Sequence, residues 1–419
     1  MINIEVLRDQ PELVRAAMKS RGVRAPVDQI LELDATRRST IVEADTLRSH
    51  RNIASKEIGR MSSPPKKLVG EMREVGIRIK NLEAKMRGLE EQISSVLLTL
   101  PNIPSPTTPV GKNQAGNREI RTVGDQRLFD FEIRAHWDIG ERLGIIDFER
   151  GVRMSGSRFY LLRGKGARLQ RALIDWMLDT HTEESGYEEV YVPYIVNSAT
   201  ATGSGQLPKF AETMYQDAEE DFWLIPTAEM PLTGMFADEI LSESMLPLQF
   251  VAHTPCFRRE KAAAGKDTRG IKRVHQFEKV EMYKFVEPLT SEQELENLLL
   301  DVETICRSLA IPYKVIELCT GDLGFSAAKT YDVEMWAPAT QEWLEVSSCS
   351  NCTDFQTRRS KIRYRPTGGK GVVFPHTLNA SGLALPRVIA AILENYQQAD
   401  GSVTIPDVLQ PYTKFDHIG

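Results

Sequence analysis

Apolar residues between Leu68 and Val96 recur at alternating intervals of four and three residues. The positions in this repeat are Leu68, Met72, Val75, Ile79, Leu82, Met86, Leu89, Ile93 and Val96. A 3.5-residue period sustained over several turns is typical of a helix that packs lengthwise against a second helix. The chain must therefore supply a partner helix of similar length.

The segment before this repeat carries a less regular version of it. Its apolar positions are Leu33, Ile41, Ala44, Leu47, Ala54 and Ile58, with Arg37 and Arg51 as interruptions. Gly59, Pro64 and Pro65 force a turn between the two segments. The sequence predicts an antiparallel coiled-coil hairpin over about residues 28–100, with helices roughly 45–50 Å long at 1.5 Å per residue. Residues 1–25 are predicted to form a short strand and one amphipathic helix that ends at Gly22.

Cations gather around the predicted turn of this hairpin. They are Arg48, Arg51, Lys56, Arg60, Lys66 and Lys67, and before Glu71 only Glu57 opposes them. A single charged residue on a helix usually just faces water. A cluster of one sign favours contact with a phosphate backbone. Because no base-reading motif accompanies it, we expect recognition of RNA shape and backbone.

Composition limits the other partners. The chain has 419 residues and a net charge of -6, so it has room for two or three domains and no general affinity for nucleic acid. We therefore expect RNA contact from a local patch and no DNA partner. No apolar run is long enough to span a membrane, and the start lacks the apolar core of a signal peptide, so we expect a cytoplasmic protein without a membrane partner.

The five cysteines do not suggest a disulfide framework, because their number is odd and their spacing wide. Cys349 and Cys352 form a C-x-x-C pair. Zinc normally requires a second pair or matching histidines. We therefore expect reduced, partly buried thiols.

A proline- and glycine-rich run, residues 101–117, predicts an extended linker. A larger region with mixed helices and strands follows at 118–419. Within it, residues 156–197 predict a strand, a turn, a long helix and a second strand, with Gly186 near the end of the helix. Pro193 falls in that second strand, which indicates a sheet edge or an interface because proline lacks the N–H group.

Residues 257–281 predict two strands joined by a loop. Alternation places Arg258 and Glu260 on one face of the first strand. It places Arg273, His275, Phe277, Lys279 and Glu281 on one face of the second, opposite the core-like Val274, Val280 and Met282. Alternation leaves two interpretations open, a solvated face or a polyanion site. Arginines can hold phosphate oxygens, Phe277 can stack on a base and Glu281 can pair with an ammonium group, which suits a nucleotide and a zwitterion.

Further polar groups precede the C-terminal region. Thr227 and Glu229 are predicted to share one face of a short extended segment. Glu342 and Glu345 lie near a string of hydroxyl residues, which predicts either a polar strand edge or a Mg²⁺ site.

The C-terminal region combines polar residues with the start of a helix. Asn379 and Ser381 precede a helix that is predicted to begin near Pro386. Arg387 would then lie at the positive end of that helix, where anions are favoured.

The stretches FRRE, GKDTRGIKRVHQF, TAE, EVSSCSNC and TLNASGLA, together with the helical hairpin, resemble the bacterial-type seryl-tRNA synthetases, a family of class II aminoacyl-tRNA synthetases. The resemblance covers the chain in order. It implies an α+β fold in which a tRNA-binding domain at 1–100 with a coiled-coil arm precedes a class II catalytic domain at 118–419, an antiparallel sheet flanked by helices. It also implies a homodimer.

The resemblance implies serine–tRNA ligase activity as well. Such an enzyme uses ATP and Mg²⁺ to convert L-serine to seryl-adenylate and pyrophosphate. It then transfers serine to the 3′ end of tRNA(Ser), and to tRNA(Sec) in hosts that have it.

Family roles transfer to matching positions of this chain. The implied catalytic residues are Arg258, Glu281 and Arg387. The implied ATP-binding residues are Arg258, Arg259, Glu260, Arg273, Val274, Phe277, Glu345, Val346, Ser347, Ser348 and Arg387. The implied serine-binding residues are Thr227, Ala228, Glu229, Arg258, Glu281, Asn379 and Ser381. Glu345 and Ser348 would bind the metal, the six arm cations would bind tRNA, and Pro193 would lie in the dimer interface.

One detail of the metal site conflicts with simple alternation, which pairs Glu345 with Ser347 rather than Ser348. A β-bulge between Glu345 and Ser348 would reconcile the two. The loop 261–272 is expected to stay mobile until ATP or the tRNA acceptor end arrives.

Two other functions remain possible at this point. One is a class II ligase that loads an amino acid onto a carrier protein, although such relatives lack the long arm. The other is a non-catalytic, synthetase-like RNA-binding paralogue, which should have lost some charged site residues.

Overall fold

The computed structural model describes residues 1–261 and 269–419. Two compact units make up this part of the chain, Ile2–Pro101 and Asn102–Gly419 together with Met1. The loop expected to be mobile, 261–272, lies for the most part outside the described residues. No helix in the described ranges combines the length and apolar character needed to cross a membrane.

The N-terminal unit is helical. Its helices are α1 (Ile4–Asp9), α2 (Pro11–Ser20), α3 (Val27–Ile58) and α4 (Lys66–Leu97). The short strand predicted near the N-terminus is wrong, because Asn3 caps a helix there: its side chain accepts a hydrogen bond from the backbone N–H of Glu5 at 3.0 Å. Gly22 follows α2 with a φ of 67°, a conformation suited to glycine.

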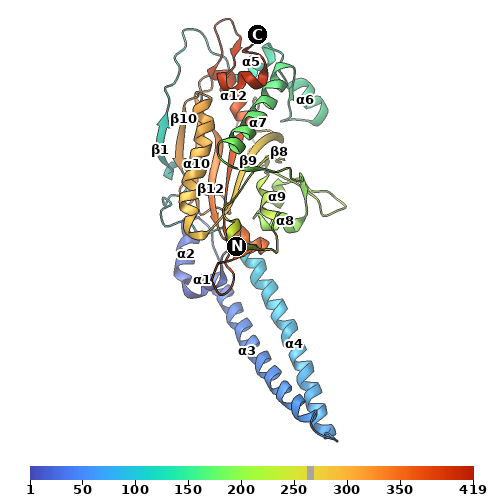
Figure 1. Cartoon of the computed structure of the whole chain (residues 1–419). Helices are drawn as coiled ribbons and strands as arrows, with labels where there is room; N and C mark the ends of the chain where they lie inside the picture. Colours follow the sequence, from blue (N-terminus) through green and yellow to red (C-terminus); the bar gives the residue numbers. More distant parts are fainter. Residues whose placement is uncertain (262–268) are drawn as a thin grey trace. The chain divides into compact units, whose positions relative to one another are not determined.

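Helices α3 and α4 pack side by side as a hairpin, as predicted (Figure 1). All nine residues of the regular seam are buried or half-buried. Arg37, which interrupts the weaker seam, forms ion pairs with Asp34 at 3.0 Å and with Glu90 of the other helix at 3.6 Å. The polar interruption is therefore compensated by a pair across the hairpin.

The C-terminal unit, Asn102–Gly419, contains a sheet of eight strands. In spatial order they are β1 (Arg118–Val123), β10 (Tyr313–Glu317), β11 (Lys329–Ala337), β12 (Glu342–Thr353), β14 (His376–Ala384), β9 (Gln276–Val286), β8 (Leu248–Phe257) and β4 (Glu188–Glu189). Neighbouring strands are antiparallel except for the short edge pair of β4 and β8. This confirms the predicted antiparallel sheet.

Short pairs and helices complete this unit. The pairs are β2 (Ile146–Asp147) with β3 (Leu161–Leu162), β5 (Ile195–Val196) with β6 (Trp223–Leu224), β7 (Ile240–Ser242) with β13 (Arg363–Arg365), and β15 (Val403–Thr404) with β16 (His417–Ile418). The helices are α5 (His136–Arg142), α6 (Phe148–Ser155), α7 (Lys165–Glu183), α8 (Ser198–Gly203), α9 (Glu229–Gly234), α10 (Ser291–Ser308), α11 (Phe355–Ser360), α12 (Leu385–Asn395) and α13 (Gln410–Thr413). Helices α7, α10 and α12 pack on the sheet (Figure 1).

The segment predicted as a linker is irregular apart from the short 3-10 helix Gln114–Gly116, and from Asn102 it belongs to the C-terminal unit. The backbone N–H of Asn102 donates to the carbonyl of Phe325 at 2.9 Å, and that of Ser105 donates to Ala328 at 2.8 Å. The boundary between the two compact units therefore falls at Pro101.

Pro193 lies between β4 and β5 and is exposed, so its predicted place within a strand is wrong. Strand β4 ends at Glu189, because only two of its residues pair with β8.

The predicted strand pair around residues 257–281 exists but is shorter at the loop end. Phe257 and Gln276 form the last pair of β8 and β9. Beyond them, the N–H of Arg258 still reaches the carbonyl of His275 at 2.9 Å, but the N–H of Arg259 turns to Thr213 at 3.0 Å. The predicted strand conformation is thus wrong for Arg258, Glu260, Arg273 and His275, although they remain at the end of the hairpin.

Strand β9 divides two environments. Val280 and Met282 face the main core with α7, α10 and α12. On the opposite face, Tyr283 and Phe285 enter a second apolar cluster. Phe277, Lys279 and Glu281 share this second face nearer the loop, so a polar site and an apolar core follow one another along one strand face.

Ile79 is buried in the hairpin seam, with 3% of its surface exposed. Ile79→Ala is expected to lower the free energy of unfolding of the hairpin by about 2–4 kcal/mol, through lost burial and the cavity left behind. Hydrogen exchange of α3 and α4 amides in the full chain measures this. Ile77→Ala is the control, because Ile77 is 55% exposed on the same helix. Equal exchange rates in the two variants would contradict the seam assignment.

Candidate active site

Two adjoining cavities open on the face of the sheet that carries Lys279 and Glu281. The larger has a volume of about 730 Å³ and the smaller about 80 Å³. Six residues line both: Arg258, Glu260, Arg273, Lys279, Glu345 and Ser381. The cavities therefore meet at a boundary with charges of both signs.

The larger cavity has acidic and basic groups in close contact. Lys279 forms an ion pair with Glu281, and its Nζ also donates to the hydroxyl of Thr227 at 2.7 Å. The side chains of Lys279 and Glu281 are only 6% and 2% exposed. Buried charges of this kind are stable only when paired, so the pocket holds its own counter-ions in place.

Glu229 lies beside this ion pair. Its carboxylate accepts hydrogen bonds from Gln356 at 2.5 Å and from Asn379 at 3.3 Å. Burial, and next the charge of Glu281, raise the pKa of Glu229 to about 7. Glu229 does not sit in an extended segment as predicted: it begins helix α9, and its N–H donates to the hydroxyl of Thr227 at 3.2 Å.

The smaller cavity combines an aromatic ring with cations. Phe277, Val274 and Val346 are among its apolar residues, and Arg387 closes another side. The guanidinium of Arg258 lies 5.0 Å from the centre of the Phe277 ring. A planar base with attached phosphates matches this combination of ring face and positive charge.

Arg387 lies at the start of helix α12, as predicted. Pro386 occupies the first turn of this helix. Arg387 donates to the carbonyl of Glu345 at 2.5 Å and also lies 3.5 Å from its carboxylate. It is therefore held across the mouth of the smaller cavity from β12.

A β-bulge reconciles Glu345 with Ser348. Val333 pairs with Ser347, while the next residue, Glu334, pairs with Glu345, so Val346 is the extra residue. Glu345 and Ser348 consequently share one face, whereas Val346 and Ser347 are buried.

A third oxygen ligand candidate lies next to this pair. Asp332 pairs with Ser348 across the strands, and one of its buried oxygens has no hydrogen-bond partner among the described residues. Burial, and next the charge of Glu345, raise the pKa of Asp332 well above its usual range. Within the described ranges no three acidic, histidine or cysteine side chains form a metal cluster. Two carboxylates and a hydroxyl fit a hard cation such as Mg²⁺ that takes further oxygens from phosphate or water.

Almost all the residues predicted to bind ATP, serine or the metal line one of the two cavities. The exceptions are Ala228, which is buried in the second apolar cluster, and Arg259, whose guanidinium lies 5.9 Å from the ring of Tyr215. For Arg259, the turn of the backbone away from β9 explains the difference.

Lys279 was missed as a site residue, although alternation placed it between Phe277 and Glu281. Gln356, on α11, was missed as well. No local sequence pattern marks it, because its role depends on residues far away in the chain: it donates to Glu229 and accepts a hydrogen bond of 3.0 Å from the hydroxyl of Tyr283. The five cysteines are free, and they are fully rather than partly buried.

Comparison with known proteins matches both units. Residues 1–104 match the seryl-tRNA synthetase N-terminal domain, and residues 210–396 match the class II tRNA synthetase core domain (G, H, P, S and T). Serine–tRNA ligases of Thermomicrobium roseum and Roseiflexus sp. are 53% and 54% identical over 98% of this chain, covering 93% and 98% of their own lengths. One of Dehalococcoides mccartyi is 50% identical over the full length of both.

The chain belongs to the seryl-tRNA synthetase family. Its structure matches that of seryl-tRNA synthetase from Pyrococcus horikoshii complexed with ATP, with a TM-score of 0.93 and 41% identity over 100% of this chain and 99% of the other. It also matches the cytoplasmic serine–tRNA ligase from Naegleria fowleri in complex with AMP, with a TM-score of 0.89 and 34% identity over 100% and 98% of the two chains. The predicted family, fold class and serine–tRNA ligase enzyme are confirmed.

The arm cations of this synthetase differ in their surroundings. Arg48 forms ion pairs with Asp45 and Glu83, both at 2.7 Å, so it contributes to the hairpin itself. Lys56, Arg60, Lys66 and Lys67 are exposed, and none pairs with a carboxylate among the described residues; Arg51 is half-buried. The exposed four form the more accessible part of the predicted tRNA-binding cluster.

Glu229→Gln is expected to reduce the pH dependence of stability between pH 4.5 and about 7. The folded carboxyl keeps its proton where the unfolded one loses it, so the unsubstituted protein loses stability as pH rises through this window. The loss is roughly 1–3 kcal/mol, since a shift of one pKa unit corresponds to about 1.4 kcal/mol. Urea unfolding of both proteins from pH 4 to pH 8 measures it. A difference in stability that does not change with pH would contradict the raised pKa.

Proposed function

We propose that this chain activates L-serine with ATP to seryl-adenylate and pyrophosphate, and then transfers serine to the 3′ end of tRNA(Ser). The observation that carries the proposal is the boundary between the two cavities, where Arg258 and Arg273 border both. A nucleotide in one cavity and an amino acid in the other would meet at these cations. The relatives solved with ATP and with AMP support this assignment.

The smaller cavity would hold the nucleotide. Phe277 would stack on adenine, and Glu260 would meet its amino group. Since the guanidinium of Arg258 now lies on the Phe277 ring, a base on this ring face would displace it and direct it toward the α-phosphate. Arg273 and Arg387 would bind the outer phosphates.

The larger cavity would hold serine. Glu281 would pair with the ammonium group of serine, and Thr227, Glu229, Asn379 and Ser381 would line the pocket. Because these groups are polar and partly buried, alanine in the same pocket would leave some of them unpaired, which supports discrimination by hydrogen bonding.

The reaction needs positioning and charge neutralisation more than covalent help from the protein. The serine carboxylate would attack the α-phosphorus in line as pyrophosphate leaves, while Arg258 and Arg387 balance the developing charge. Glu345 and Ser348, with Asp332 beside them, would hold Mg²⁺. When bound, that ion would offset the negative charge of the phosphates.

We also propose a homodimer. Tyr191 and Ile195, on either side of Pro193, are 85% and 51% exposed. Exposed apolar residues in sequence around a proline favour an interface over a solvated surface. Because its proposed partner is a tRNA used in protein synthesis, we propose that the enzyme acts in the cytoplasm. tRNA(Sec) would be a second substrate in hosts that have it.

One assay separates the two other functions considered from sequence. A carrier-protein ligase would show exchange of pyrophosphate but transfer labelled amino acid to protein. A non-catalytic paralogue would show no exchange. We expect serine-dependent exchange followed by transfer of serine to tRNA.

Arg258→Ala is expected to reduce serine-dependent ATP–pyrophosphate exchange at least about a hundredfold, because charge stabilisation of the transferring phosphoryl group is lost. Arg153→Ala is the control, since Arg153 is exposed on α6 and pairs with Glu149. Near-normal exchange by a folded Arg258→Ala variant would exclude the proposed role.

We expect tRNA binding to weaken when Lys56, Arg60, Lys66 and Lys67 are all replaced by Ala. The fall of log affinity with log salt concentration should also become less steep, by roughly 3 in the magnitude of the slope. Pyrophosphate exchange should be unchanged. The matched control exchanges Lys for Arg and Arg for Lys at the same four positions, which preserves charge. Equal salt slopes in the two variants would contradict binding through phosphate contacts.

A further inference from the structure

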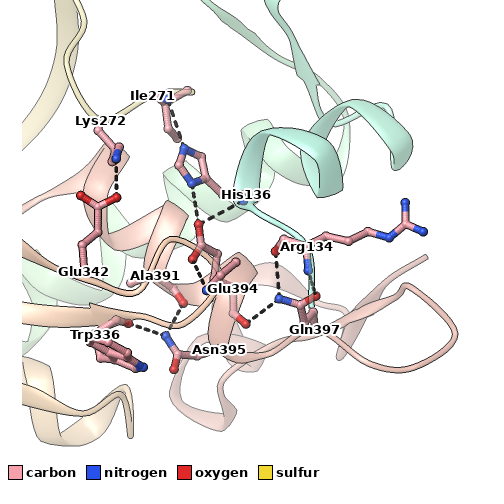
Figure 2. Close-up of polar contacts among 11 residues, drawn as sticks. Arg134, His136, Ile271, Lys272, Trp336, Glu342, Ala391, Glu394, Asn395 and Gln397 are labelled. Carbon is pink, nitrogen blue, oxygen red and sulfur yellow. Dashed lines mark hydrogen bonds and ion pairs between the residues drawn. The ribbon is translucent and has the colours of Figure 1, made fainter. Parts of the chain in front are cut away.

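A buried histidine and glutamate connect helices α5 and α12 with the backbone just before β9 (Figure 2). His136 and Glu394 are both 0% exposed. One oxygen of Glu394 accepts hydrogen bonds from the backbone N–H of His136 at 3.1 Å and from its ring Nδ1 at 2.8 Å. The other oxygen accepts from the N–H of Ala339 at 3.0 Å. The carboxylate is thus held by three donors from two other segments.

The second ring nitrogen of His136 defines its role. Nε2 lies 3.3 Å from the backbone N–H of Ile271, which can only donate. Nε2 must therefore be the acceptor, and the ring proton lies on Nδ1, toward Glu394. This pattern resembles the way carboxylates fix the tautomer of functional histidines. Here, the ring holds a backbone amide in place.

Gly270 shows how closely this backbone approaches the ring. A Cβ atom at Gly270 would lie 2.2 Å from His136 Nε2 and 2.8 Å from the ring of Trp137, and the φ of Gly270 is 77°. Only glycine fits such a position without displacement. Arg269 lies over the same tryptophan, with its guanidinium 4.9 Å from the ring centre. The start of α5 therefore contacts three successive residues, 269–271.

The next two residues lead directly into the smaller cavity. Lys272 forms an ion pair with Glu342 at 2.6 Å, and its carbonyl lies 3.4 Å from Nε of Arg387 (Figure 2 shows the ion pair). Arg273 lines both cavities. Arg273 and Arg387 are the two cations proposed for the outer phosphates. A shift of the backbone at Ile271 would thus move Arg273, and it would also move the carbonyl of Lys272 that Arg387 contacts.

We infer that His136 and Glu394 are positioning residues for the nucleotide: they fix the backbone at Gly270–Ile271 and thereby place Arg273 and Arg387. Neither side chain lines either cavity, so the effect acts through the backbone. The inference rests on the proposed role of the smaller cavity. It predicts weaker binding of ATP with little change in the binding of serine, because the groups around Glu229 and Glu281 in the proposed serine pocket are held by other contacts.

The test compares three variants of the full chain in serine-dependent pyrophosphate exchange. His136→Ala removes both ring contacts. His136→Asn keeps a side-chain donor for Glu394 but is too short to serve as the acceptor for Ile271. Glu394→Gln removes the charge that orients the ring. Tyr187→Phe is the control, because it loses a partly buried hydrogen bond of 2.8 Å to Asp301 in the same unit, away from both cavities.

We expect the KM for ATP to rise at least about fivefold in each variant, with the KM for serine within about twofold of the unsubstituted enzyme. A merely structural role would reduce the folded fraction, which lowers kcat and leaves both KM values unchanged. Hydrogen exchange at Ile271 should accelerate in His136→Asn, while exchange in α12 stays as in the control. An unchanged KM for ATP, or equal increases for ATP and serine, overturns the inference.

If His136→Ala does not fold, His136→Asn and Glu394→Gln decide the question by the same two constants, with thermal unfolding as the check on folding. Absence of exchange in the unsubstituted enzyme would instead refute the proposed function of the cavities. The two failures are therefore distinguishable.

Discussion

The buried ion pair of Lys279 and Glu281 is the interaction on which the catalytic unit depends. It lies on strand β9, whose opposite face belongs to the main core. Charges at such depth are costly unless each has a partner, and removal of one would leave the other buried without its counter-ion. The fold meets this cost with neighbours from other segments, above all the hydroxyl of Thr227. The pocket therefore holds its own counter-ions in place before a ligand enters.

Much of the fold follows from local patterns. The 3.5-residue seam defines the hairpin because helix packing is periodic, and the nine seam residues are all buried or half-buried. Alternation assigns Phe277, Lys279 and Glu281 to one face of β9 because the strand is regular there. The start of α12 was predictable because Pro386 suits a first helical turn.

The features that sequence missed depend on single hydrogen bonds, of which two are local and one joins distant segments. Glu229 begins a helix because Thr227 satisfies its N–H, which alternation cannot reveal. Arg259 leaves the strand because Thr213 accepts its N–H, and no periodicity marks that turn. Near the N-terminus, a single cap by Asn3 outweighed the apolar alternation of the first residues. In each case one hydrogen bond decided between two locally acceptable conformations.

The bulge at Val346 places Glu345 and Ser348 on one face although they are three residues apart in the sequence. Because Val346 is the extra residue of β12, Glu345 and Ser348 pair with Glu334 and Asp332, which are only two residues apart on β11. If β12 paired regularly with β11 here, without the bulge, the carboxylate and the hydroxyl would turn to opposite sides of the sheet. Such regular pairing would keep every chemical group of the site and still separate them.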